Sequence, residues 1–309
     1  MTELLYLTRR EVAQLLPPIP EQLDLVERTY RAMAAGRVEL PPKPGIHPRP
    51  NAFIHAMPAY LADDDVAALK WVAGYPENRE RGLPYISGLI VVNDAGTGLP
   101  AAVMDAAEIT AARTAAASGV CVRRFAPKGW RKAAMLGCGE QGRYHTRVLA
   151  ALNPALAIRA FDLQPERVAE LEGPAEAAPD ARAAVEGAEV IVSAGPILEH
   201  PDPPLASDWL GRRYLALPID FDFYFQPGPI READLFLVDD VAQFEYYRER
   251  GHFRGWPRPD CSVGEAIGRP GSPERVACVN LGVGALDAAF AKRVFDEARS
   301  RGSGTSLAL

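Results

Sequence analysis

The chain has 309 residues, of which 48% are hydrophobic and 24% charged, and this length is sufficient for two globular domains. A net charge of −6 leaves no basic face for nucleic acid, and no apolar run approaches the roughly 20 residues of a membrane span. The N-terminus lacks the pattern of a signal peptide, and the four cysteines are scattered without a C-x-x-C pair. We therefore expect a cytoplasmic protein with reduced thiols, no membrane or nucleic-acid partner and no metal site.

The first third of the chain predicts one amphipathic helix followed by short antiparallel strands. The helix covers residues 20–36, and the strands cover 53–60, 66–72, 89–93 and 99–104. Between them lies a proline-rich loop, residues 41–50, which carries Lys43, His47 and Arg49. These basic groups either contact an anion or belong to a solvated connector. An alanine-rich helix is expected over residues 106–122.

From residue 132 onwards buried runs alternate with helical patterns. The strands are expected at 133–136, 156–161, 190–194, 214–219, 235–238 and 276–279, and the helices at 141–152, 165–171, 181–186, 242–249 and near 264–267. This alternation predicts a doubly wound parallel sheet of the Rossmann type, in which the crossover near 171–181 is short. A last helix over 285–299 is expected to rejoin the first domain.

A glycine loop lies at the start of this second region. Gly137, Gly139 and Gly142 follow the first buried strand and precede a helix, and Asp162 ends the next strand. This order is typical of a dinucleotide-binding unit, in which the helix N-terminus faces the pyrophosphate. Asp162 would bind the ribose hydroxyls and repel a 2′-phosphate, so NAD is favoured over NADP. The alternative is a tight strand-to-helix turn that binds no ligand.

Three charged residues are candidates for the chemistry. Lys70 lies in an apolar strand, where burial lowers its pKa towards the range of proton transfer; the alternative is a protective edge lysine. Arg113 lies among alanines and suits a substrate carboxylate, unless it is a surface arginine. Asp220 follows the strand at 214–219 and suits acid–base work, with Asp208 and Asp222 as rivals and loop capping as the alternative.

Several motifs together resemble the ornithine cyclodeaminase/mu-crystallin family. They are Met57-Pro58-Ala59-Tyr60, the run Lys70 to Asn78, Thr97-Gly98-Leu99-Pro100-Ala101 with Met104-Asp105, the run Thr110 to Ala116, the glycine loop with Gln141, and Leu281-Gly282-Val283-Gly284 with Asp287. The resemblance covers the chain from about residue 41 to its end. The lysine and arginine motifs are specific to the family, whereas many folds share the glycine loop.

The resemblance implies an α/β subunit of two domains. Residues 1–119 with 286–309 would form an α+β domain, with an antiparallel sheet, that binds substrate and joins a homodimer; residues 120–285 would form the NAD-binding Rossmann domain. It also assigns roles. Lys70 and Asp220 are the expected catalytic residues, and Arg113 holds the substrate carboxylate. The expected cofactor-binding residues are Gly137, Gly139, Glu140, Gln141, Gly142, Asp162 and Thr114.

This chain departs from the family pattern at the substrate's other contacts. Lys43 stands where the family has an arginine, His55 replaces a glutamate that contacts the distal amine of ornithine, and Tyr85 replaces a threonine. A histidine is a poor partner for a second ammonium group, so ornithine is placed in doubt while the carboxylate contact stays.

The resulting hypothesis is an NAD-dependent enzyme that acts at the Cα–N bond of a small amino acid or its imine. In the cyclodeaminase version the hydride leaves Cα, the distal amine displaces ammonia from the iminium, and the hydride returns. The alternatives are an imine reductase or amino-acid dehydrogenase that uses NAD(P)H, and a ligand-binding protein similar to mu-crystallin with little catalysis.

Overall fold

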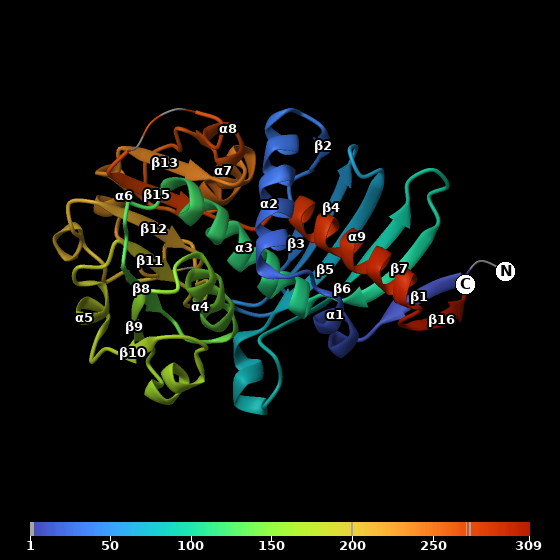
Figure 1. Ribbon diagram of the computed structural model, residues 1–309, viewed down its shortest axis with the longest axis horizontal. Coiled ribbons are helices and arrows are strands. Elements are labelled where there is room, and N and C mark those ends of the chain that lie inside the picture. The colour runs from blue at the N-terminus through green and yellow to red at the C-terminus, as the bar shows by residue number, and fades with distance from the viewer. Residues whose placement is uncertain (1–2, 199, 270, 272) are drawn as a thin grey trace. The chain divides into compact units, whose positions relative to one another are not determined.

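The computed structural model describes residues 3–198, 200–269, 271 and 273–309. The chain forms two compact units. Unit 1 comprises Met1–Arg113 with Gly282–Leu309, and unit 2 comprises Thr114–Leu281. Helix α3 (Ala107–Phe125) runs through the first boundary, so a single helix supplies residues to both units. The elements of both units are labelled in Figure 1.

Unit 1 is built on one eight-stranded sheet with the order β16-β1-β7-β6-β5-β4-β2, to which β3 adds by pairing with β4. The strands are β1 (Glu3–Leu7), β2 (Val38–Glu39), β3 (Gly45–Ile46), β4 (Phe53–Leu61), β5 (Val66–Gly74), β6 (Ile86–Asp94), β7 (Pro100–Asp105) and β16 (Thr305–Ala308). The expected antiparallel pairing is confirmed for β4 to β7. The sheet as a whole is mixed, because β1 pairs with β7 in parallel.

The ends of the chain were not expected to join this sheet. Strand β16 lies in the tail that begins with a glycine- and serine-rich run at Gly302, and it pairs antiparallel with β1. The polar composition of the tail hides this strand, since its burial pattern shows four exposed residues. An edge strand without a buried face leaves no alternating signal in the sequence.

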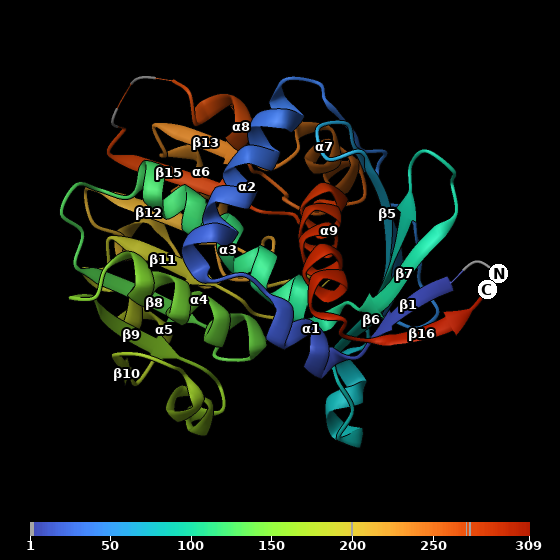
Figure 2. The same ribbon diagram turned by 45° about the vertical axis from the view of Figure 1, so that its right-hand side comes forward.

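Three helices complete unit 1: α1 (Arg9–Leu15), α2 (Ile19–Ala34) and α9 (Gly284–Arg301). Helix α9 contacts β4, β5 and β6, and α2 in turn contacts α9. Figure 1 shows α9 running across the strands, and in Figure 2 it stands between them and α2. The face of the sheet that carries Lys70 is therefore covered, while the alternate residues of β5, such as Trp71, point away from α9.

Unit 2 contains a parallel sheet with the order β10-β9-β8-β11-β12-β15-β13-β14. The strands are β8 (Lys132–Leu136), β9 (Ala157–Phe161), β10 (Ala175–Ala177), β11 (Val190–Ser193), β12 (Tyr214–Pro218), β13 (Leu235–Val238), β14 (Cys261–Ser262) and β15 (Arg275–Val279). Every pairing recorded between these strands is parallel. The predicted Rossmann-type α/β class is thus confirmed, and the strand order reverses between β8 and β11, where such sheets bind their ligands.

The crossovers of unit 2 are short. They contain α4 (Glu140–Leu152), α5 (Ala181–Val185), α6 (Pro227–Arg231), α7 (Val241–Glu249), α8 (Val263–Ala266) and the 3₁₀ segments η2 (Pro165–Glu170) and η3 (Ser207–Trp209); unit 1 has η1 (Pro76–Arg81). The helix expected over 165–171 is a 3₁₀ helix, and β10 follows it after four residues. The short crossover predicted near 171–181 is confirmed.

Candidate functional site

Lys70 lies in the middle of β5, in register with Met57 of β4 and Ile90 of β6. Its side chain is 1% exposed because it points to the face that α9 covers. Burial, together with the positive charge of Arg113, lowers the pKa of Lys70 to about 7 against the opposing effect of Asp287. A lysine in this state exchanges a proton near neutral pH, and the alternative of an exposed edge lysine does not apply.

Asp287 is the carboxylate that joins the charged groups of unit 1. It lies in the first turn of α9 and is fully buried. One oxygen is 2.8 Å from Nζ of Lys70, and the other accepts a hydrogen bond of 2.9 Å from Nε of Arg113. Although burial opposes it, these two cations lower the pKa of the Asp287 carboxyl. The result is a buried lysine–aspartate–arginine triad in which the carboxylate orients both cations.

The backbone at Gly282 shapes the other side of Arg113. Gly282 has a φ of +81°, and a Cβ there would lie 2.9 Å from Nη1 of Arg113. Only glycine accommodates both this backbone conformation and the close guanidinium. The carbonyl oxygen of Gly282 also accepts a 3.2 Å hydrogen bond from Nζ of Lys43, which is buried. Lys43 thus adds a third buried cation beside the triad.

His55 lies on β4, and its ring stacks on Phe53 at a centroid distance of 4.4 Å. Burial, with the nearby charges of Lys43, His47 and Lys70, lowers the pKa of His55 to about 3, so the imidazole is neutral at physiological pH. His47 contacts the His55 ring edge-on at 6.2 Å.

Tyr85 and Arg49 were also expected near a substrate or an anion. Tyr85 immediately precedes β6, and its carbonyl oxygen accepts a bond from the Tyr75 amide. Arg49 is exposed and its guanidinium donates to the carbonyl of Pro48.

The glycine loop of unit 2 connects β8 to α4. Gly137 has a φ of +89°, and a Cβ there would lie 2.5 Å from the carbonyl oxygen of Ala194. A Cβ on Gly142 would lie 2.6 Å from the carbonyl oxygen of Gly137. Both positions therefore need glycine for the tight turn. Gly139 is different, because a Cβ there would meet no heavy atom within 4 Å.

Gly139 is also the N-cap of α4, and no side chain caps this helix end. The amides at the N-terminus of a helix carry a partial positive charge, which suits a bound phosphate. Within the described part of the chain, Oε1 of Gln141 is buried without a hydrogen-bond partner.

Asp162 follows β9, and its carboxylate accepts hydrogen bonds from the amides of Cys138 (2.7 Å) and Gln164 (2.9 Å). The acid is therefore fixed directly against the glycine loop. Thr114, on the unit 2 side of the boundary in α3, is 5% exposed. These positions form the nucleotide-binding candidate of unit 2.

Asp220 comes two residues after β12 and is 1% exposed. Its carboxylate accepts hydrogen bonds from Oγ of Ser193 (2.6 Å) and from the amide of Gly195 (2.8 Å). Burial raises the pKa of Asp220 to about 7, although these two hydrogen bonds oppose the shift. Of its rivals, Asp208 forms an exposed pair with Arg182.

Sequence reasoning did not assign a role to Asp287, Gly282 or Ser193. Asp287 stood in a quoted motif, but the contact with Arg113 spans 174 residues of sequence. The only signal in the sequence was an aspartate at the start of an expected helix, three residues after the Gly-x-Gly run that ends at Gly284. That pattern is also typical of a simple helix start, so it could not identify the triad.

Comparison with known proteins decides the family. A model described as "Ornithine cyclodeaminase/mu-crystallin family" matches residues 3–216. The chain belongs to this family. The resemblance noted from the lysine, arginine and glycine-loop motifs is thereby confirmed.

Three similar proteins extend over the whole chain. The nodulation efficiency protein NfeD of Rhizobium meliloti is 38% identical, and the match covers 97% of each chain. An archaeal alanine dehydrogenase dimer with bound NAD is 26% identical with a TM-score of 0.88, and covers 100% of both chains. The Δ1-pyrroline-2-carboxylate reductase of Thermococcus litoralis, in complex with NADH and L-proline, is 25% identical with a TM-score of 0.85, over 98% of this chain and 99% of its own.

The described residues contain neither a cluster of metal ligands nor a membrane-spanning helix. No group of three or more His, Cys, Asp or Glu in that part of the chain is arranged to hold a metal ion. None of the helices it contains is both long enough and apolar enough to span a bilayer.

Proposed function

We propose that the protein is an NAD-dependent oxidoreductase that interconverts a small amino acid and its imine. The observation that carries this proposal is the buried triad, in which Asp287 holds a lysine of near-neutral pKa and an arginine on its two oxygens. Family membership and the two similar structures that contain NAD or NADH support the same reading.

The residues of the glycine loop fit a dinucleotide. The open space at Gly139, the uncapped amides of α4 and the carboxylate of Asp162 supply contacts for a pyrophosphate and a ribose. The carboxylate at position 162 disfavours the extra phosphate of NADP. When bound, NAD supplies the hydride acceptor or donor for the substrate's Cα.

In unit 1, Arg113 binds the substrate carboxylate, and Lys43 adds a second positive charge. Nε of Arg113 is committed to Asp287, so the substrate would use the guanidinium's remaining N–H groups. This contact orients Cα and its nitrogen. Lys70, with a pKa of about 7, takes a proton from the substrate ammonium group during oxidation, or returns one to the nitrogen during reduction.

Asp220 supplies a second group that changes protonation near neutral pH. As a neutral acid it can donate a proton to an imine or a carbinolamine, and as a carboxylate it can receive one. Oxidation of an amino acid removes the Cα hydride and one proton and leaves an imine. Water then attacks the imine to release ammonia and the oxo acid, and reduction of the imine reverses the first step.

The charges in unit 1 favour an oxidoreductase over a cyclodeaminase. A cyclodeaminase substrate carries a second amino group, which is a cation before it is deprotonated. Near Lys70, the cation Lys43 and the neutral His55 supply no counter-charge for that amine. A substrate with an apolar, hydroxyl or acidic distal end avoids this repulsion.

Cyclodeaminase activity is the second candidate, and Asp220 is the observation that favours it. A carboxyl group with a pKa of about 7 can accept the proton of a distal ammonium group, so that the free amine attacks the imine carbon and ammonia leaves. Ornithine cyclodeaminase also gives its name to the family to which the chain belongs.

A substrate panel tests the proposal. The purified protein is incubated with NAD⁺ and alanine, aspartate, proline or ornithine, and in reverse with NADH, ammonium and the matching oxo acids, while NADH and ammonia are followed together. We expect net NADH turnover with a member lacking a second amine, and its loss in Lys70→Ala without a change in NADH affinity. Ammonia release from ornithine without net NADH would establish the cyclodeaminase instead. NADH binding without turnover anywhere would leave only a binding role.

The outer face of the unit 1 sheet supports a homodimer. Trp71 and Leu89 are opposite each other in the β5–β6 register and are 47% and 44% exposed, on the face that α9 does not cover. Large apolar side chains in adjacent strands are costly to leave in water. We propose that a second copy of the chain covers this face, as the dimeric state of the similar alanine dehydrogenase suggests.

A further inference from the structure

The loop that carries Asp220 is held in a strained conformation by contacts within unit 2. Phe221, the next residue, has a φ of +61°, and Phe253, in the segment after α7, has a φ of +56°. A left-handed backbone is rare and energetically unfavourable for bulky residues, so the surroundings must enforce it. The two aromatic rings lie 5.2 Å apart and are both buried.

Asp222 links the two strained segments. Its Oδ2 accepts a 2.7 Å hydrogen bond from the amide of Phe253, and its Oδ1 lies 3.7 Å from Nδ1 of His252. The Asp222 side chain is 10% exposed, so this link is mostly shielded from water. Because Asp222 is two residues beyond Asp220, the bond to Phe253 fixes the path of the loop that presents Asp220.

The opposite side of the same loop is also constrained. Gly195 donates its amide to Asp220, and a Cβ there would lie 2.4 Å from the ring of Phe223. The loop therefore packs closely on the segment after β11 at one side and is tied to Phe253 on the other. Neither the rotamer nor the depth of Asp220 can change without releasing one of these contacts.

Asp222 has a second influence, which is electrostatic. Its negative charge adds to burial in raising the pKa of Asp220. Tyr224, on the same loop, also faces Asp220; burial and the charge of Asp220 raise the pKa of this phenol, so it stays neutral. From β11 and the residues after it, Asp220 meets only the neutral donors Ser193 and Gly195 among its recorded hydrogen bonds.

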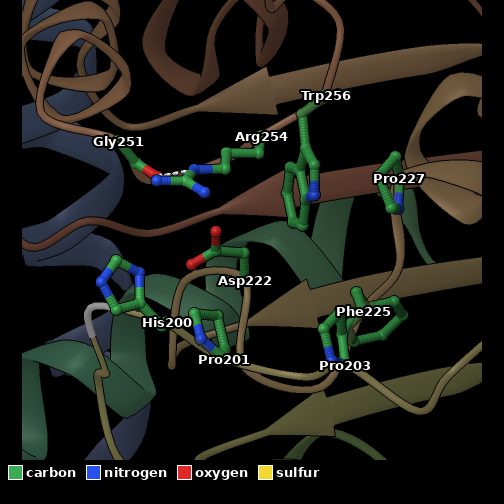
Figure 3. A pocket seen from close by; sticks show the side chains of 9 residues that line it. All are labelled: His200, Pro201, Pro203, Asp222, Phe225, Pro227, Gly251, Arg254 and Trp256. Atoms are coloured by element: carbon green, nitrogen blue, oxygen red, sulfur yellow. Dashed lines mark hydrogen bonds between the residues drawn. The ribbon is translucent and has the colours of Figure 1, made fainter.

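The groups around Asp222 itself include basic side chains. Asp222 forms part of the lining of a cavity of about 220 Å³ together with His200, Arg254 and Trp256. Figure 3 shows the carboxylate between the ring of His200 and the guanidinium of Arg254, which is turned to the carbonyl of Gly251. Among the described residues, no ion pair joins Asp222 to Arg254, and Nδ1 of His252 lies 3.7 Å from the Asp222 carboxylate.

We propose that Asp222 is a positioning residue for Asp220, which it serves by tying the Asp220 loop to Phe253 and by placing a negative charge beside it. This inference rests on the proposed role of Asp220 as the proton donor and acceptor of unit 2. It extends that role to a residue that does not touch substrate. It also explains why two aromatic residues keep a strained backbone.

Two substitutions separate the two effects. Asp222→Asn keeps an oxygen that can accept the Phe253 amide but removes the charge, whereas Asp222→Ala removes both. Asp208→Asn is the control, because it removes one carboxylate from an exposed pair with Arg182 elsewhere in unit 2. The titration of Asp220 is followed by NMR in protein labelled with ¹³C at aspartate carboxyl groups, and Asp220→Asn assigns the signal.

We expect the Asp220 signal to titrate near pH 7 in the wild type and in Asp208→Asn. In Asp222→Asn its midpoint should fall by on the order of half a pH unit or more, as for the loss of one nearby like charge. In Asp222→Ala the amide hydrogen of Phe253 should exchange with solvent at least about tenfold faster than in the wild type. In Asp222→Asn its exchange rate should stay as in the wild type. An unchanged midpoint in Asp222→Asn, or unchanged exchange in Asp222→Ala, would overturn the proposal.

Activity adds a readout that distinguishes this proposal from the function on which it rests. With the best substrate of the panel, the limb of the pH–rate profile that reports Asp220 should move to lower pH in Asp222→Asn by the same amount as the NMR midpoint. Full turnover in Asp220→Asn would refute the catalytic role of Asp220, while the NMR and exchange results would still decide whether Asp222 positions it.

Discussion

Replacing Asp287 by asparagine is the sharpest test of the triad. Asparagine has nearly the same shape and keeps one oxygen acceptor, so the substitution removes a charge without making a cavity. In the wild type this fully buried carboxylate contacts Nζ of Lys70 at 2.8 Å and Nε of Arg113 at 2.9 Å. The variant leaves the buried Arg113 guanidinium, and Lys70 whenever it is protonated, without a counter-charge.

The expected cost follows from this burial and depends on pH. Removal of one partner of a buried ion pair typically costs about 3–5 kcal/mol. Arg113 cannot lose its charge, but Lys70 can. In the wild type Asp287 raises the pKa of Lys70 against burial and Arg113, so the variant's Lys70 has a pKa below 7. Just below pH 7, Lys70 is therefore protonated in the folded wild type but not in the folded variant. The loss of stability caused by the substitution then grows as the pH falls through 7, and reaches about 1.4 kcal/mol for each unit by which the pKa of Lys70 is lowered.

Chemical denaturation at pH 6 and pH 8 measures both parts. We expect Asp287→Asn to lose about 3–5 kcal/mol at pH 6 and clearly less at pH 8. Asp296→Asn, which removes an exposed partner of Lys292 from the same helix, should cost about 1 kcal/mol or less at both values. A loss in Asp287→Asn that is below 1 kcal/mol, or that is larger at pH 8 than at pH 6, would refute this account of the triad.

Three further predictions concern the other contacts. Gly282→Ala should displace Arg113 and raise KM for the substrate about tenfold, with NADH affinity unchanged. The control is Gly36→Ala, where φ is similar but the added Cβ meets no atom, so backbone strain should be its only effect. Equal KM values for the two variants would contradict the steric argument. Asp162→Asn should lower the ratio of the NADPH to the NADH dissociation constant about tenfold, as measured by fluorescence titration. An unchanged ratio would exclude charge repulsion at this position. Trp71→Glu should shift the mass in sedimentation equilibrium from dimer to monomer, and an unchanged dimer would show that another face associates.

The sequence predicts unit 2 better than unit 1 for a physical reason. Strands buried on both faces, such as β8 and β12, are continuous apolar runs, and the glycine loop needs glycine at Gly137 and Gly142 for local steric reasons. Both signals lie within a few residues. In unit 1, β16 is an exposed edge strand and β1 is a short, half-buried strand. Both pair with partners about 100 or more residues away, and neither leaves a clear periodic pattern in the sequence.

The candidate site shows the same division. Lys70 and Arg113 could be singled out because each is a charge in an apolar segment. The counter-ion could not, because Asp287 meets Arg113 only after α9 returns across the sheet. Sequence alone also could not distinguish Lys43 from Arg49, two cations in one loop, of which one is buried against Gly282 and the other exposed.

Burial brings two groups of opposite type to the same pKa. The pKa of Lys70 falls from 10.5 to about 7, and that of Asp220 rises from 3.8 to about 7. In each case burial away from water is the largest cause. Polar partners limit both shifts. The charge of Asp287 raises the pKa of Lys70, and the hydrogen bonds from Ser193 and Gly195 lower the pKa of Asp220. Near pH 7 each group is therefore part protonated and part not. An enzyme equipped in this way can give or take a proton in either direction of an amine–imine interconversion, so the supply of substrate and of oxidised or reduced nucleotide would set the direction of the reaction.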